Sequence, residues 1–439
     1  MKIRLVLLAY VVANAILYSM MLPLWEGFDE PFHFGYVQWL ANGRGLPDAR
    51  GSVLSSEVAE SISMAPGSRV VQRNLPQVTK YSEYFSLPRA KRAETRKALD
   101  ETRPELRRQD SGMTNYEAHH APLAYAVLAP LERMLAAAPL PLRVLALRII
   151  GALFGGLLLY FGADRLFSEL EMRDRYRSAG VFCVVSCQMT WATIAHVAND
   201  WLAVPLAVWS LVAAIRYWNN PSPRNVAWMA GLLSLGLLTK AYFVALIPAA
   251  VALCALLRRW KELCVALAIL FATAAPRYAR NAYRYGTVTG MVESRAGIGA
   301  TVVVQAAPTL DWPRAAVASV RSAIWTGNNS FTTFSASTLA VVVAVWAVAR
   351  RLVLEAATGI AGQFWLRGPC AGWGHTGRDS RGCRAGCGVG GLLDQGRTHE
   401  RGRWFNRSRP AVFGRGAPAC SRQRGEMLNW HTKCAEIRC

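Results

Sequence analysis

Long apolar runs separated by short basic segments dominate this sequence. The first run, residues 3–24, would form an α-helix of about 33 Å, enough to cross the hydrocarbon core of a bilayer. Further runs lie at 143–163, 178–198, 201–217, 226–257, 263–276 and 336–349. A soluble protein could bury one such helix. The series instead predicts an all-α integral membrane protein, a polytopic bundle of about eight transmembrane helices.

The first run could also be the apolar core of a cleaved signal peptide. It is long for that role, however, and no small-x-small cleavage pattern follows it. We therefore interpret residues 1–24 as a retained transmembrane helix.

The formal net charge of +22 would fit a nucleic-acid partner, but the distribution of the charge does not. Residues 367–439 hold 14 Arg and Lys against 5 Asp and Glu, and so contribute +9 (14 − 5). Much of the remaining positive charge flanks the apolar runs, where the positive-inside rule places it. The sequence also contains no nucleic-acid-binding module. Membrane lipid is therefore an expected partner and nucleic acid is not.

The basic clusters predict a topology as well. If Lys2 and Arg4 are cytoplasmic, residues 25–142 form a long extracytoplasmic loop, and each later short basic cluster falls on the cytoplasmic side. The run 226–257 is too long for one crossing and has positive charge at both ends. This pattern favours a hairpin of two short crossings, with Lys240 near its outer turn.

The apolar segment 121–138 is harder to place. It contains Glu132 and Arg133 and is bracketed by Pro122 and Pro139, so we interpret it as an interfacial helix on the outer face. A true crossing here is the alternative, and it would reverse the sidedness of everything that follows.

These features divide the chain into four parts. The first helix (1–24) is followed by an extracytoplasmic loop with interfacial helices (25–142), a transmembrane bundle (143–353) and a Gly-, Arg- and Cys-rich tail (354–439). From residue 367 onward, 14 Gly, 13 Arg and 6 of the 10 Cys occur without apolar periodicity. We expect a disordered tail of the kind that a frameshift or truncation produces. Its cysteines do not have the spacing of a standard zinc module.

The predicted topology brings several ionisable residues to the outer membrane boundary, where such residues are candidates for function. Two motifs lie in the long loop: FDEPFHFG at 28–35 and YEAHHAPLAY at 116–125. An acid pair at a helix start is also a common N-cap, and Tyr and His are common in interfacial belts. Three further motifs adjoin later runs: AND at 198–200, GLLSLGLLTK at 231–240, and RYARN at 277–281.

The order of these motifs over residues 1 to about 350 resembles the GT-C superfamily of membrane glycosyltransferases, which includes protein O-mannosyltransferases and aminoarabinose transferases. The resemblance implies transfer of a sugar from a polyprenyl-phosphate donor to a hydroxyl of a lipid, glycan or protein acceptor. The expected mechanism is a single inverting displacement, with the site facing outward from a bacterial inner membrane. Asp29 is the expected general base, Glu30 is the second choice, and Asp200 positions the acceptor or the base.

The resemblance also implies residues that bind the donor and acceptor. These are His33, Glu117, His119, Lys240, Arg277, Arg280 and Asn281. Arg and Lys can hold the single phosphate of the leaving group, so no metal is required, although some relatives use a divalent cation. The alternatives are a transporter or lipid-carrier flippase, which predicts ionisable residues within crossings and internal repeats, and a non-catalytic membrane protein.

Overall fold

The computed structural model describes residues 2–27, 29–101, 104–290 and 300–316, together with residues 344, 345, 347, 348 and 351. The chain divides into two units, Met1–Cys370 and Ala371–Cys439, and every described residue belongs to the first. The expected tail, 354–439, lies outside the described residues, as does most of the run 336–349.

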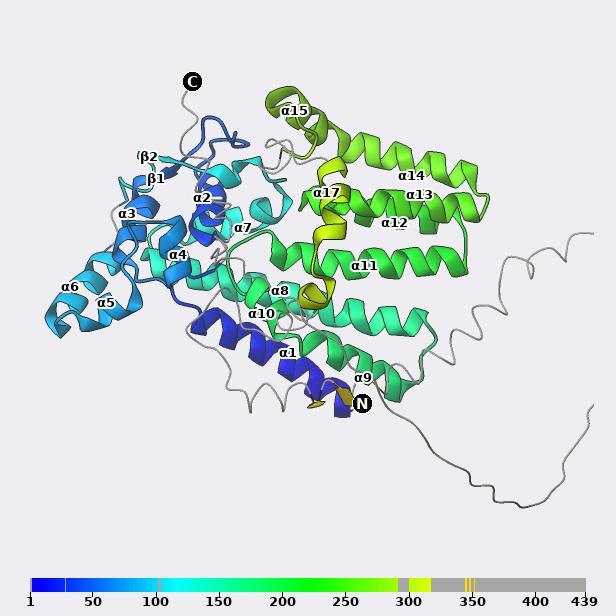
Figure 1. The fold of residues 1–439 in the computed structure, drawn as a ribbon, viewed down its shortest axis with the longest axis horizontal. Helices are drawn as coiled ribbons and strands as arrows, with labels where there is room; N and C mark the ends of the chain where they lie inside the picture. The colour runs from blue at the N-terminus through cyan, green and yellow to red at the C-terminus, as the bar shows by residue number, and fades with distance from the viewer. Residues whose placement is uncertain are drawn as a thin grey trace, which may run out of the picture. The chain divides into compact units, whose positions relative to one another are not determined.

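Helices dominate the described part of the chain. Three of them are long and apolar enough to cross a membrane: α1 (Lys2–Met21), α8 (Leu140–Glu169) and α11 (Asp200–Asn219). A fourth span is possible if α14 (Trp260–Thr273) and α15 (Ala275–Tyr285), which bend by 53° at their junction, count as one. Figure 1 shows α8 between α1 and α11, packed against both. The prediction of an all-α transmembrane bundle is confirmed.

In the described part of the chain, two other runs predicted to cross the membrane form shorter helices. The run 178–198 forms α9 (Asp174–Val185) and α10 (Gln188–Ile194), separated by a break at residues 186–187. The run 226–257 folds back on itself as α12 (Pro223–Leu237), the 3-10 helix η2 (Ala241–Leu246) and α13 (Ile247–Leu256). Lys240 lies at the turn of this hairpin, as the charge pattern predicted.

Small residues allow the long helices to approach closely. Gly155 of α8 lies against the start of α11, where a β-carbon would collide with the carbonyl oxygen of Trp201. One turn earlier, a β-carbon at Gly151 would lie 3.4 Å from the Trp201 ring. Such contacts are typical of membrane helix pairs, in which backbone proximity provides much of the packing energy. These contacts fix the position of α11 along α8, and with it the position of Asp200, the first residue of α11.

The long first loop is an ordered layer of short elements beside one end of these helices (Figure 1). In chain order they are α2 (Glu30–Ala41), β1 (Val53–Ser55), α3 (Ser56–Met64), α4 (Arg69–Asn74), α5 (Tyr81–Ser86), α6 (Arg89–Asp100), β2 (Asp110–Thr114), η1 (Tyr116–His119) and α7 (Leu123–Met134). The two strands pair antiparallel, with Val53 opposite Thr114. Beyond α15, the described elements are α17 (Ala300–Ala306) and η3 (Ala307–Thr309).

Helix α7 corresponds to the segment whose crossing was in question. Its 12 residues span roughly 18 Å, which is too short to cross a bilayer. Its Glu132 does not face water: it is fully buried and forms ion pairs with Arg143 of α8 and with Arg107. Helix α7 is therefore fastened to the N-terminal end of α8, a role that the interfacial interpretation did not include.

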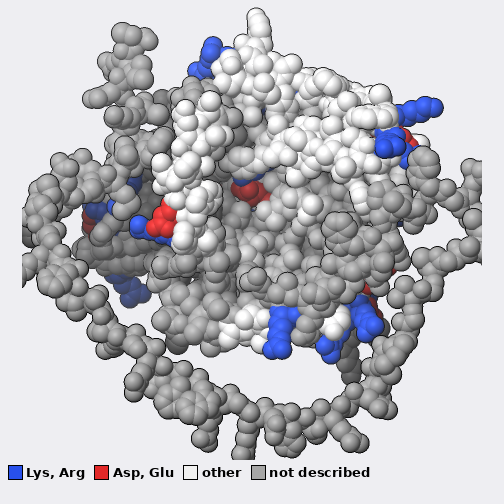
Figure 2. All heavy atoms as spheres, turned by 45° about the vertical axis from the view of Figure 1, so that its right-hand side comes forward, with Lys and Arg blue, Asp and Glu red and all other residues white. Residues whose placement is uncertain are grey.

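The charged side chains on one face of the molecule agree with this arrangement. In Figure 2, the residues that the structure describes on this face are mostly uncharged, with Lys and Arg side chains near the margins. A protein surface that faces lipid is expected to be uncharged in this way, with its charged side chains at the edges. Acidic and basic side chains also lie recessed within the uncharged surface.

Candidate functional site

Asp29 lies at the start of α2, just beyond the first transmembrane helix. Its backbone is left-handed (φ 53°), a conformation that is costly for a residue with a side chain. Its carboxylate is exposed and makes no capping hydrogen bond to α2. Instead, it accepts a hydrogen bond from Tyr116, whose pKa is raised by burial and by the charge of Asp29. The helix-cap alternative is therefore wrong for Asp29.

Glu30, the next residue, has a different environment. It is fully buried, and its carboxylate accepts hydrogen bonds from Arg148 Nε (2.7 Å) and from the backbone N–H of Val197 (2.9 Å). Burial favours its neutral form, but the charge and hydrogen bonds of Arg148 outweigh burial and lower the pKa of Glu30. An enclosed carboxylate with these partners is a structural anion. Its place in the fold does not suit the second-choice general base.

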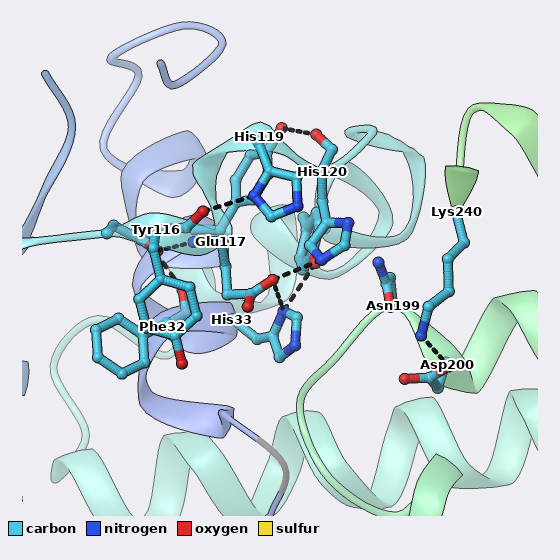
Figure 3. Close-up of polar contacts among 12 residues, drawn as sticks. Phe32, His33, Tyr116, Glu117, His119, His120, Asn199, Asp200 and Lys240 are labelled. Atoms are coloured by element: carbon cyan, nitrogen blue, oxygen red, sulfur yellow. Dashed lines mark hydrogen bonds and ion pairs between the residues drawn. The ribbon is translucent and has the colours of Figure 1, made fainter. Parts of the chain in front are cut away.

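A cluster of imidazoles and phenols surrounds Glu117 (Figure 3). His33 lies one turn into α2, and its Nδ1 is 2.8 Å from the Tyr125 hydroxyl and 4.0 Å from Glu117 Oε2. His120 Nε2 is 2.5 Å from the same Glu117 oxygen. The His119 ring lies tilted against that of His120, with 4.2 Å between the ring centroids, and His119 Nδ1 is 2.6 Å from the Tyr116 carbonyl oxygen.

Two members of the cluster have strongly shifted pKa values. Burial lowers the pKa of His33 to about 3, so this imidazole is neutral. For Glu117, burial raises the pKa, but the imidazoles of His33, His120 and His119 outweigh burial and lower it to about 2. Glu117 is therefore an anion buried among aromatic rings, and such an anion requires a strong partner.

Asp200 and Lys240 form an ion pair on the other side of this cluster (Figure 3). Lys240 Nζ is 2.6 Å from Asp200 Oδ1, and the two side chains are about one-fifth exposed, at 19% and 20%. Asp200 occupies the first turn of α11, where the helix dipole favours an acid. The lysine predicted to hold phosphate thus has a protein carboxylate as its partner.

Arg277, Arg280 and Asn281 all lie on α15. The Arg277 Nη2 donates to the carbonyl oxygens of His119 and His120, both at 2.7 Å, so this buried guanidinium holds the backbone of the cluster. Arg280 lies farther out, 3.8 Å from a carboxylate oxygen of Asp48. Asn281 donates to the carbonyl oxygen of Thr289 (3.1 Å).

Most of the predicted site residues therefore belong to one connected region. Tyr116 is hydrogen-bonded to Asp29 and directly precedes Glu117 in the sequence. Asp200 is close enough to influence the pKa of His33. Arg280 and Asn281 lie at the edge of this region, with partners outside it. Glu30 is buried against Arg148 and belongs to the packing between helices.

The sequence reasoning did not assign roles to four residues of this region: Tyr116, His120, Tyr125 and Arg148. The first three lie inside a motif that was recognised, so closer attention to its aromatic positions could have identified them. Arg148 gives a separate signal, because an arginine inside an apolar run must have an anionic or carbonyl partner.

Comparison with known proteins identifies a family but no characterised relative. No curated protein and no solved structure is similar enough to this chain to count as a match. A family model described as "Predicted membrane protein (DUF2142)" matches residues 14–362, which include all the site residues above. The match covers well over half of the sequence, and its membrane character agrees with the apolar helices of the bundle. The chain therefore belongs to the DUF2142 family of predicted membrane proteins.

Proposed function

We propose that this protein is a membrane glycosyltransferase that moves a sugar from a polyprenyl-phosphate donor to an acceptor hydroxyl at the extracytoplasmic face. The observation that carries the proposal is the state of Asp29. It is an exposed carboxylate, held in a costly backbone conformation at the end of the first transmembrane helix, and it does not cap its helix. Strain retained at an exposed acid is typical of functional positions.

The chemistry follows from an exposed carboxylate at this place. Asp29 accepts the proton of the acceptor hydroxyl, while that oxygen forms a bond to the anomeric carbon of the donor. The bond from this carbon to the phosphate oxygen breaks, and polyprenyl phosphate leaves with the bonding pair. One such displacement inverts the anomeric configuration. The tyrosine that donates to Asp29 would orient the carboxylate toward the acceptor.

Cations at the same face would stabilise the leaving phosphate. Arg280 is the better candidate, because its nearest carboxylate is 3.8 Å away. Lys240 could contribute only by exchanging Asp200 for the phosphate, since the two now form a close ion pair. This exchange would release the Asp200 carboxylate to position the acceptor. Stabilisation of charge where it develops is commonly the largest catalytic term.

The test is sugar transfer in proteoliposomes from radiolabelled polyprenyl-phosphate sugars. Asp29→Asn keeps the shape of the side chain but removes its basicity, so we expect the rate to fall about 100- to 10,000-fold, with donor binding little changed. Arg280→Ala should instead weaken donor binding. Asp100→Asn, an exposed aspartate at the end of α6, is the matched control and should behave as wild type.

Two outcomes would contradict the proposal. One is an Asp29→Asn variant that transfers sugar at the wild-type rate. The other is a wild-type protein that moves the labelled lipid between leaflets without transferring its sugar, which would instead indicate the flippase alternative.

A further inference from the structure

We infer that Glu117, His119 and His120 bind one transition-metal dication of the zinc class. One carboxylate oxygen and one ring nitrogen from each histidine all lie within 4.8 Å of one another. The three residues follow β2 in a single 3-10 turn, which brings positions 117 and 120 to the same side. Figure 3 shows their side chains converging from this one segment.

The surrounding hydrogen bonds leave His119 prepared for a metal. Its Nδ1 is 2.6 Å from the Tyr116 carbonyl oxygen, which can only accept, so the ring proton lies on Nδ1. The lone pair of the neutral ring then lies on Nε2, the nitrogen that would coordinate an ion. A metal-bound histidine typically has this arrangement, with its second nitrogen donating to a backbone carbonyl.

The backbone of the turn is also fixed in place. Asn115 accepts a hydrogen bond from the Glu117 N–H (3.1 Å) and donates to the Phe32 carbonyl oxygen (2.9 Å). From the opposite side, Arg277 binds the carbonyl oxygens of His119 and His120 and does not compete for their ring nitrogens. Ligands held in this way pay little entropy on binding an ion.

The ligand spacing suits a small ion. Ligand atoms about 2.1 Å from a tetrahedral metal lie roughly 3.4 Å apart. The closest pair, His120 Nε2 and Glu117 Oε2, is 2.5 Å apart, and the widest separation among the three is no more than 4.8 Å. Side-chain rotations of about 1 Å would therefore equalise the distances without movement of the backbone.

Glu117 needs such a partner. It is buried, and among the described residues its Oε2 has no hydrogen bond of good geometry, although His120 Nε2 lies close to it. A buried carboxylate oxygen in this state calls for an explanation, and a bound cation would supply one. Two imidazoles and one carboxylate form the three-ligand set of zinc sites that leave a fourth position open. Magnesium and calcium prefer oxygen ligands alone.

The experiment uses the full-length chain in detergent. Because six cysteines follow residue 367, they are first replaced by serine, so that thiolates there do not bind the probe ions. The protein is treated with chelator and then titrated with Zn²⁺ and with Co²⁺, whose visible absorption reports coordination by nitrogen and oxygen. We expect one ion per chain. Glu117→Gln, His119→Ala and His120→Ala should each weaken affinity by at least 10- to 100-fold, the loss that even second-shell changes produce.

Glu83→Gln, an exposed glutamate in α5, is the matched control and should bind as wild type. Equal loss in this control, or ligand variants that bind as tightly as wild type, would overturn the inference. If the ligand variants do not fold, the wild-type cobalt spectrum decides, and a spectrum indistinguishable from free Co²⁺ would leave only a hydrogen-bonded Glu–His pair. These measurements use no sugar donor, so they do not depend on the proposed transferase activity.

Discussion

The ion pair between Glu30 and Arg148 should be a main determinant of stability. Arg148 donates to Glu30 and also to the carbonyl oxygens of Leu22 and Pro23, while Glu30 accepts from the backbone of Val197. One side-chain pair thus connects the end of α1, the start of α2, helix α8 and the segment before α11. The perturbation we choose is Glu30→Gln, which keeps the shape and removes the charge.

The expected cost follows from what remains buried. Arg148 is 3% exposed, so Glu30→Gln leaves an enclosed guanidinium without its counterion. Breaking a buried pair in this way typically costs about 3–5 kcal/mol. Each kcal/mol lowers the melting temperature by roughly 2–4 °C in domains of 150–250 residues, so a fall of about 6–20 °C is expected.

The double variant Glu30→Gln with Arg148→Gln distinguishes this reasoning from a simple loss of contacts. Removing both charges eliminates the unpaired ion and leaves mainly the Leu22 and Pro23 carbonyl oxygens in need of partners, at about 1–3 kcal/mol. The double variant should therefore be more stable than Glu30→Gln alone. Thermal unfolding in detergent, at one scan rate, measures this order, with the exposed Glu94→Gln as a control that should stay within about 0.5 kcal/mol. Costs that simply add, or a single variant as stable as wild type, would refute the reasoning.

Two further predictions concern the bundle. Gly155→Ala forces a β-carbon against the Trp201 carbonyl oxygen and should lower the stability of the protein by about 1–3 kcal/mol. In the control Gly231→Ala, the new β-carbon meets no atom, so the protein should not be destabilised. Equal melting temperatures for the two variants would exclude the close packing of α8 and α11. In a background without native cysteines, a cysteine at Ser86 should react with an impermeant thiol reagent applied from outside, and one at Arg175 should not; the reverse pattern would invert the topology.

The sequence alone was sufficient to predict a helical membrane protein. The prediction of a helical bundle rests on the number and length of apolar runs, and the hairpin at 226–257 rests on its length and the positive charge at both ends. Both are local properties: transfer of an apolar segment into lipid depends on its own composition and not on distant partners. For the same reason, the charge pattern alone predicts that Asp29, Asp200 and Lys240 share one face of the membrane.

The tertiary structure decided the environment of each of these residues. Asp29 and Glu30 are adjacent and chemically alike, yet one is exposed and the other is enclosed by Arg148, 118 positions away in the sequence. Likewise, His33 contacts Tyr125, which lies 92 positions away in the sequence, and Lys240 pairs with Asp200, which lies 40 positions away. Contacts of this kind depend on which helices pack together and on how far each helix is shifted along its neighbour. Close approaches such as that of Gly155 to α11 determine both the pairing and the shift. No local pattern contains that information, because burial and ion pairing belong to the packed bundle and not to the segment that supplies the residue.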